Sequence, residues 1–155
     1  MSMLPKVEIF AGLSEEEQAA LENSCVTRNY PRNTVVINEN DFADSLYVIE
    51  SGRVKVYCSD KNGKEYIMNT LGPGDYFGEL ALLDDDRRSA SVRTLEKSTF
   101  TIMFKDEFHA IMERHPKIAQ TLIRNLTRRV RKLTENVKSL ALQDVYGRVT
   151  KVLMT

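Results

Sequence analysis

The sequence predicts a mainly β domain that is followed by a long α-helix. Between residues 26 and 104, short β-branched and apolar runs recur about every 8 to 12 residues, a spacing typical of an all-β sandwich or barrel. After Pro116 no Gly or Pro occurs until Gly147, so one helix of about 28 residues and about 42 Å can run from Pro116 to Gln143. The charge changes at the same place: Lys and Arg number 12 against 19 Asp and Glu through Ile111, and 10 against 3 from Met112 onward. We therefore expect two structural parts.

The overall composition is that of an ordinary soluble domain. The chain has 155 residues, of which 42% are hydrophobic and 28% are charged. No stretch approaches the roughly 18 to 20 apolar residues of a membrane span, and the N-terminus lacks the apolar core of a signal peptide. We expect a cytoplasmic protein with no membrane partner.

Side chains that bind metals are too few for a metal enzyme. The two cysteines, Cys25 and Cys58, cannot build a disulfide framework or a Cys-rich zinc or iron–sulfur site, and we expect both to be reduced and buried. With only His109 and His115, the multi-histidine site of a metal-dependent cupin enzyme or a zinc hydrolase cannot be assembled. We interpret both histidines as ordinary helical residues and expect no metal and no enzymatic activity.

Local signals predict the first helix and the strands. Ser14 and Glu17 form a capping box at the start of a short helix that runs to about Asn23. Asn62-Gly63 predicts a tight hairpin turn between two strands. The predicted strands are Val26–Tyr30, Thr34–Ile37, Ser45–Ile49, Arg53–Cys58, Glu65–Leu71, Ser89–Thr94 and Ser98–Phe104.

In the predicted strand Arg53–Cys58, apolar and polar side chains alternate, which predicts one buried and one solvated face. The side chains expected on the buried face are Val54, Val56 and Cys58. Those expected on the solvated face are Arg53, Lys55 and Tyr57.

The long helix carries an apolar seam with a heptad spacing, formed by Leu126, Val130, Leu133, Val137 and Leu140. A β domain of roughly 110 residues cannot cover a helix of about 42 Å along one side, whereas a second copy of the helix can. We therefore expect a homodimer through this seam. The simpler alternative is a helix that packs only on its own β domain.

The end of the chain predicts a further element. We expect Asp144 to cap a new short helix over Val145–Met154, whose apolar face has nothing in the chain to bury it. This helix is interpreted as the beginning of a second domain that this chain lacks. The basic run from Arg128 to Lys132 is interpreted as a solvated helix flank and not as a DNA contact.

One segment carries residues suited to bind a phosphate and a sugar. Phe77-Gly78-Glu79-Leu80-Ala81-Leu82-Leu83 is followed, ten residues after Gly78, by Arg88-Ser89-Ala90. A glycine at the start of a short helix lets an anion approach backbone N–H groups, and Arg88 adds a charged donor fork. Glu79 would repel an anion, so we expect it to accept a proton from a sugar hydroxyl.

Two simpler interpretations of these residues stay open. Arg88 could form a surface ion pair with Asp84, Asp85 or Asp86. Glu79 could be a carboxylate that the helix dipole alone favours at a helix N-terminus.

The segment from Phe77 to Leu82, with Arg88-Ser89-Ala90, resembles the phosphate-binding cassette of cyclic-nucleotide-binding domains, including the Gly-to-Arg spacing. Over essentially the whole chain, the strand series with Gly52 and Gly74, the long helix and Asp144-Val145-Tyr146-Gly147-Arg148 resemble the bacterial regulators of the cyclic-AMP receptor protein and FNR family. The resemblance implies an eight-stranded β jelly roll over residues 1–115, a dimerisation helix over 116–143, and the start of a truncated winged helix-turn-helix domain over 144–155.

The resemblance also implies the ligand and its contacts. The effector would be cAMP or a related cyclic nucleotide, with neither haem nor an iron–sulfur cluster. Arg87 stands where many family cassettes have Pro, which adds positive charge beside the pocket. The implied ligand-binding residues are Gly78, Glu79 and Leu80 in the cassette, Arg88 and Ser89 at the cyclic phosphate, Val56, Met68, Leu71 and Phe77 as apolar lining, and Arg129, Leu133 and Thr134 from the helix.

By this resemblance the chain is the effector-sensing and dimerisation part of a transcription regulator. It would couple nucleotide binding to the orientation of a C-terminal DNA-binding domain that this chain lacks, so its partners would be a second copy and, through that domain, DNA. The alternative is a stand-alone cyclic-nucleotide-binding domain of the kind that regulates kinases or channels. The tail from Asp144 favours the first.

Overall fold

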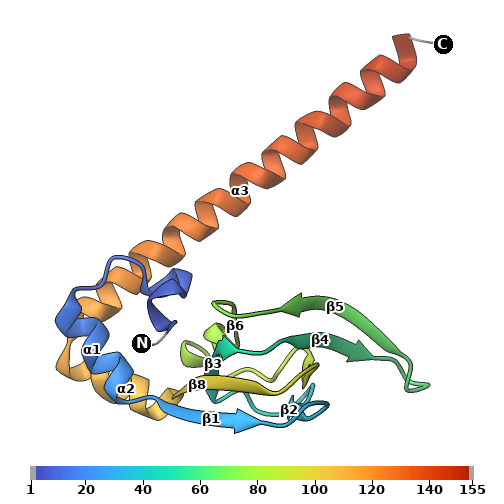
Figure 1. Ribbon diagram of the computed structural model, residues 1–155. Coiled ribbons are helices and arrows are strands. Elements are labelled where there is room, and N and C mark those ends of the chain that lie inside the picture. Colours follow the sequence, from blue (N-terminus) through green and yellow to red (C-terminus); the bar gives the residue numbers. More distant parts are fainter. Residues whose placement is uncertain (1–2, 154–155) are drawn as a thin grey trace.

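The computed structural model describes residues 3–153 and shows a β sandwich with a helical layer at one end, from which a long helix extends (Figure 1). The strands are β1 (Val26–Tyr30), β2 (Val35–Ile37), β3 (Ser45–Ser51), β4 (Val54–Ser59), β5 (Glu65–Leu71), β6 (Tyr76–Phe77), β7 (Ser91–Thr94) and β8 (Ser98–Phe104). The helices are α1 (Glu15–Asn23), α2 (Lys105–Arg114) and α3 (Pro116–Leu153), with three short 3-10 helices, η1 (Leu4–Lys6), η2 (Glu8–Phe10) and η3 (Glu79–Leu82).

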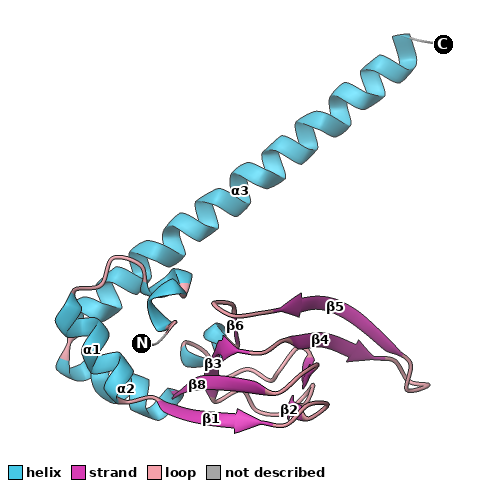
Figure 2. Cartoon of the chain, in the orientation of Figure 1, coloured by secondary structure: helices cyan, strands magenta, loops and turns pink. Residues whose placement is uncertain are grey.

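The eight strands within residues 3–153 form two antiparallel sheets of four, which confirms the predicted jelly-roll class (Figure 2). The strand orders are β1-β8-β3-β6 and β2-β7-β4-β5. The strand over Tyr76–Phe77 was not predicted, because two residues are too short for a periodic pattern. It forms by pairing with β3, where Phe77 lies opposite Tyr47.

Strand β3 is apolar without alternation because both of its faces are buried. Leu46 and Val48 belong to a core shared with the helices, whereas Tyr47 and Ile49 belong to the core between the two sheets. Successive side chains of a strand point to opposite faces. The first sheet therefore lies between the second sheet and the helical layer.

The predicted solvated face of β4 is wrong at one position. Tyr57 is only 5% exposed, because the side chains of two neighbouring cations cover its ring. Lys55 Nζ lies 5.2 Å and Arg93 Cζ 5.1 Å from the ring centroid. Cys58, expected to be buried, is half-buried, and so is Cys25.

Hydrogen bonds fix the start of α1 and attach the N-terminal segment to α3. The capping box is confirmed: the Glu17 N–H donates to Ser14 Oγ at 3.2 Å and the Ser14 N–H donates to Glu17 Oε1 at 3.4 Å. Asn125 of α3 is 8% exposed and donates from Nδ2 to the carbonyl oxygens of Ile9 (2.8 Å) and Ala11 (2.9 Å). This contact holds the N-terminal segment against α3.

Helix α3 differs from the prediction at its far end. It continues without a break from Pro116 to Leu153, 38 residues or about 57 Å, so the expected helix end at Gln143 is wrong. Asp144 does not cap a new helix, because an N-cap needs non-helical backbone and here the chain is helical on both sides. Its carboxylate instead pairs with Arg148 one turn later at 3.1 Å. Met154 lies outside the described residues.

Within residues 3–153, no helix combines the length and the apolar character needed to cross a lipid bilayer.

Candidate functional site

The predicted cassette lines a cavity of about 300 Å³ at the end of the sandwich. One wall is the turn from β6 into η3, and the opposite wall is the segment that leads into β7. The lining residues are Ala43, Gly78, Glu79, Leu80, Ala81, Asp84, Asp86, Arg87, Arg88 and Ser89. The structure therefore brings Gly78, Glu79, Leu80, Arg88 and Ser89 together, as the sequence predicted.

Gly78 is required by its conformation and by its neighbour. Its φ is +84°, in the left-handed region that side chains disfavour. A β-carbon at this position would lie 2.3 Å from Arg88 Nη1 and 2.8 Å from the carbonyl oxygen of Ser45. Only glycine leaves room for the guanidinium.

Arg88 is a buried cation at the cavity wall, only 7% exposed. Its Nη2 donates to the carbonyl oxygen of Ser45 at 2.8 Å and lies 3.2 Å from Ser45 Oγ. Its ion-pair partner Asp44 is 3.9 Å away. Burial lowers the pKa of Arg88, while neighbouring Tyr47 and Asp44 oppose that shift. Because a buried charge needs a close counter-charge, the arrangement is well suited to receive an anion.

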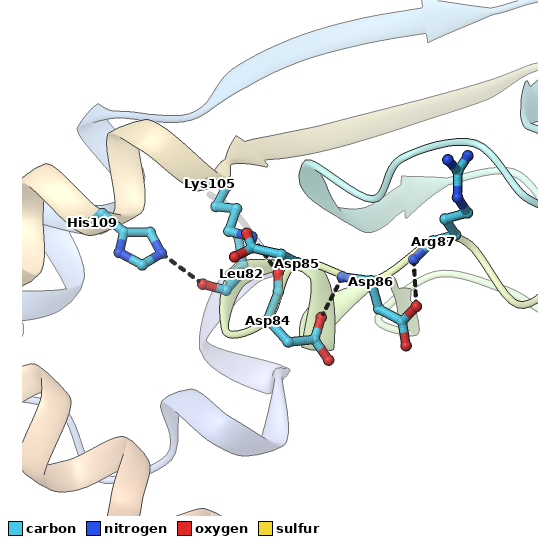
Figure 3. Close-up of polar contacts among 7 residues, drawn as sticks. All are labelled: Leu82, Asp84, Asp85, Asp86, Arg87, Lys105 and His109. Carbon is cyan, nitrogen blue, oxygen red and sulfur yellow. Dashed lines mark hydrogen bonds and ion pairs between the residues drawn. The ribbon is translucent and has the colours of Figure 1, made fainter.

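The interpretation of Arg88 as a surface ion pair with the aspartates of the preceding loop is wrong. Those carboxylates have other partners: Asp85 pairs with Lys105 of α2, Asp84 accepts from the Asp86 N–H, and Asp86 accepts from the Arg87 N–H. Lys105 also donates to the carbonyl oxygen of Asp84. His109 Nε2 lies 3.0 Å from the carbonyl oxygen of Leu82, so α2 holds the loop at two points (Figure 3).

The contacts of Lys105 and His109 with this segment were not predicted from the sequence. Lys105 and His109 are four residues apart and so lie on one face of α2, a signal that could have marked them as a pair. His109 is helical as expected. The expectation for His115 is wrong, because this residue lies between α2 and α3 with non-helical backbone.

Arg87 also lines the cavity, and its guanidinium is held by the segment that precedes β3. Its guanidinium stacks on the ring of Phe42, 4.2 Å from the centroid, and Nη1 donates to the carbonyl oxygen of Asn40 at 2.8 Å. Its backbone N–H donates to the carboxylate of Asp86 at 2.8 Å (Figure 3).

Glu79 connects the cavity with α3. Its Oε1 accepts a hydrogen bond from Arg129 Nη1 at 3.3 Å, and its side chain is 21% exposed. The second nitrogen, Arg129 Nη2, lies 3.4 Å from Oε2 of Glu8 in η2. The structure therefore places Arg129 beside the cassette, as expected, and adds Glu8, which the sequence analysis missed.

The predicted apolar lining is distributed differently. Phe77 is buried in the sandwich core and stacks on Tyr47, with ring centroids 5.0 Å apart. Val56 and Leu71 are half-buried and pack against the same core. Met68 is 63% exposed on β5. None of these four lines the cavity described above.

The helix residues beyond Arg129 lie away from this cavity. Leu133 and Thr134, with Val130 and Val137, line a separate groove of about 290 Å³ on α3. Along the seam, Val130, Leu133, Val137 and Leu140 are 57 to 65% exposed, whereas Leu126 is half-buried against its own chain's core.

The arrangement can bind an anion at Arg88 and a hydroxyl group at Glu79. The described residues contain no group of three or more His, Cys, Asp and Glu side chains that could hold a metal ion.

Comparisons with known proteins agree with this geometry. Residues 27–115 match the family model of the cyclic nucleotide-binding domain. The chain is 34% identical over 152 residues to the CRP-like cAMP-activated global transcriptional regulator of Mycobacterium tuberculosis, a match that covers 98% of this chain and 68% of that protein. It is 31% identical over 146 residues to the cyclic AMP receptor protein of Thermus thermophilus, covering 94% of this chain and 68% of that one.

A solved structure shows the same fold. The N-terminal domain of a transcriptional regulator from Streptomyces coelicolor superposes with a TM-score of 0.81 at 28% identity, covering 88% of this chain and 95% of that chain. Because the family model spans more than half of the chain and the sequence relatives extend over nearly all of it, this chain belongs to the CRP/FNR family of cyclic-nucleotide-binding domains.

Proposed function

We propose that this chain binds a cyclic nucleotide, cAMP, in the cavity lined by Gly78, Glu79 and Arg88. The observation that carries the proposal is the buried guanidinium of Arg88, which lies at the cavity wall 3.9 Å from Asp44, an aspartate whose side chain is 72% exposed. A cyclic phosphate bears one negative charge and would supply a nearer counter-charge. The names of the mycobacterial and Thermus relatives also point to cAMP.

Each cassette residue has a role in this proposal. Arg88 donates to the cyclic phosphate through its planar fork, and Ser89 adds a hydroxyl donor beside it. Gly78 leaves the space in which Arg88 lies. Because Arg129 holds Oε1 of Glu79, the second carboxylate oxygen can accept a hydrogen bond from the ribose 2′-hydroxyl.

The regulatory output that we propose is control of transcription by a homodimer. The exposed seam of α3 would be covered by the same seam of a second copy. The mycobacterial relative is described as a cAMP-activated transcriptional regulator and is longer than this chain. We place the DNA-binding domain in the part of such relatives that this chain does not span.

Isothermal titration of the purified chain with cAMP tests the ligand and the anchor together. Wild type should bind cAMP, and Arg88→Ala should lose about 2 to 5 kcal/mol, roughly 30-fold to several thousand-fold in affinity. Arg88→Lys, which keeps the charge but loses the fork, controls for folding. Arg28→Ala, at an exposed position of β1 outside the cavity lining, removes an equal charge and is the matched control. A wild-type chain that does not bind cAMP, or an Arg88→Ala affinity within threefold of wild type, contradicts the proposal.

A further inference from the structure

An ion-pair chain runs from the N-terminal segment to the cassette through a single arginine. Arg129 Nη1 donates to Glu79 at 3.3 Å and Arg129 Nη2 pairs with Glu8 at 3.4 Å. The two carboxylates lie 50 and 121 residues from Arg129 in sequence. Because the guanidinium is a rigid planar fork, contacts to both nitrogens define its plane, whereas one contact would leave it able to rotate.

The backbone of Glu8 adjoins two buried residues. The next two residues, Ile9 and Phe10, are each 1% exposed, and the side chain of Asn125 binds the carbonyl oxygen of Ile9. Tyr76 of β6 is hydrogen-bonded to the backbone of Glu8, and burial raises the pKa of that tyrosine. The core therefore fixes the backbone of Glu8, whereas its carboxylate is 58% exposed and is held at Arg129 by the ion pair.

From this geometry we propose that Glu8 is a positioning residue for the nucleotide site, which fixes Arg129 and through it the orientation in which Glu79 receives the ribose 2′-hydroxyl. The inference rests on the proposed nucleotide function of the cavity lined by Gly78, Glu79 and Arg88. Glu8 touches no ligand in this scheme. Its removal would leave Arg129 with one carboxylate and let the Arg129–Glu79 pair adopt more than one arrangement.

Glu8 has a second effect that must be separated from the first. Its negative charge weakens the binding of any anionic nucleotide, because like charges repel. That repulsion acts equally on cAMP and on 2′-deoxy-cAMP, since both carry the same phosphate. The charge effect therefore cancels in the ratio of the two dissociation constants. That ratio reports only how strongly the hydrogen bond between Glu79 and the 2′-hydroxyl favours cAMP.

The experiment measures that ratio by isothermal titration for wild type, Glu8→Ala and Glu8→Gln. We expect Glu8→Ala to reduce the preference for cAMP over 2′-deoxy-cAMP by about 1.5-fold to fivefold, the range of a partly exposed ion pair. Glu8→Gln keeps a hydrogen-bond acceptor of the same size and should recover part of the preference. Glu15→Ala removes an equal charge from the exposed first turn of α1 and should leave the ratio unchanged.

The outcomes separate this inference from the function on which it rests. Failure of the wild-type chain to bind cAMP overturns both. Binding of cAMP with a wild-type ratio near one, or with the same ratio in all four proteins, overturns the role of Glu8 and leaves the nucleotide function standing. Equal changes in both affinities would mean that Glu8 acts only through its charge, which also contradicts positioning. Should Glu8→Ala not fold, the comparison of Glu8→Gln with wild type decides.

Discussion

Gly78 and Arg88 are packed so closely that a β-carbon on residue 78 would lie 2.3 Å from Nη1 of the arginine. The same β-carbon would lie 2.8 Å from the carbonyl oxygen of Ser45, which accepts a hydrogen bond from Arg88. The absence of a side chain at position 78 thus creates the space in which the buried guanidinium lies. The two cassette residues, ten positions apart in sequence, form one structural unit.

Gly78→Ala should therefore strain the backbone at residue 78 and displace the guanidinium of Arg88. A left-handed φ costs an L-residue roughly 1 to 2 kcal/mol, and the methyl group must also displace Arg88. We expect a loss of cAMP affinity of about tenfold or more, measured by isothermal titration, together with a lower free energy of unfolding in urea.

Gly63→Ala is the matched control for this variant. Gly63 has a φ of +80° with no heavy atom within 4 Å of an added β-carbon, so alanine there brings the backbone strain without displacing a neighbour. Its stability should fall while its cAMP affinity stays at the wild-type value. Equal affinities for Gly63→Ala and Gly78→Ala would disprove the role given to the space at position 78.

The proposed dimer predicts the effect of a charge in the α3 seam. Leu133 is 57% exposed in the single chain, so aspartate there should cost the isolated chain little stability. In a helix pair the same charge would be buried without a partner. Light scattering should show a dimer for wild type and a monomer for Leu133→Asp, with Ser139→Asp, outside the seam, as the control. A wild-type monomer at tens of micromolar would refute the dimer.

If the nucleotide also reaches the seam, dimerisation and ligand binding are thermodynamically coupled. Each must then tighten the other by the same factor. We expect Leu133→Asp to lower cAMP affinity as well as dimer affinity, and cAMP to strengthen the wild-type dimer, both measured by titration at several protein concentrations. Loss of the dimer with unchanged cAMP affinity would show that the cavity and the seam are independent.

The hydrogen bonds of Asn125 should contribute to the stability of the contact between the N-terminal segment and α3. Its buried Nδ2 donates to two carbonyl oxygens, those of Ile9 and Ala11, and Asn125→Ala would leave both without this donor. Leaving buried polar groups unsatisfied costs about 1 to 3 kcal/mol, which urea unfolding would measure. Asn136→Ala, at an exposed position of the same helix, should lose much less. Equal losses would show that the contact contributes nothing specific.

The two thiols should differ in reactivity. Burial raises the pKa of Cys25 to about 12, and the hydrogen bond from Ser24 only partly opposes this. Because the thiolate is the reactive form, only about one Cys25 in ten thousand would be reactive at pH 8. The stability that the neutral buried thiol contributes is present below about pH 8.5, the pKa of an unfolded cysteine, and is lost as the pH rises toward 12.

We expect an aromatic disulfide reagent at pH 8 to modify Cys58 well before Cys25 in the folded chain, and both cysteines at similar rates in urea. Mass spectrometry of the labelled peptides distinguishes the two sites. In the Cys58→Ser variant the fast phase should disappear. Rapid labelling of Cys25 in that variant would contradict the assigned burial.

Elements that depend on neighbours in sequence could be predicted from the sequence. The capping box of Ser14 and Glu17 formed where expected because its hydrogen bonds span three residues. The hairpin at Asn62-Gly63 formed because a left-handed glycine suits that turn. The cassette was recognisable because its glycine-to-arginine spacing is a local pattern.

The tertiary structure alone decided which distant groups meet. Tyr57 is covered because Arg93 of another strand lies over its ring, and no periodicity within β4 contains that information. Arg129 is shared by Glu79 and Glu8 because α3 packs against the N-terminal segment. A helical or strand period reports the faces of one element, whereas the partners of a charge depend on how separate elements pack, and that packing is set by the buried core as a whole.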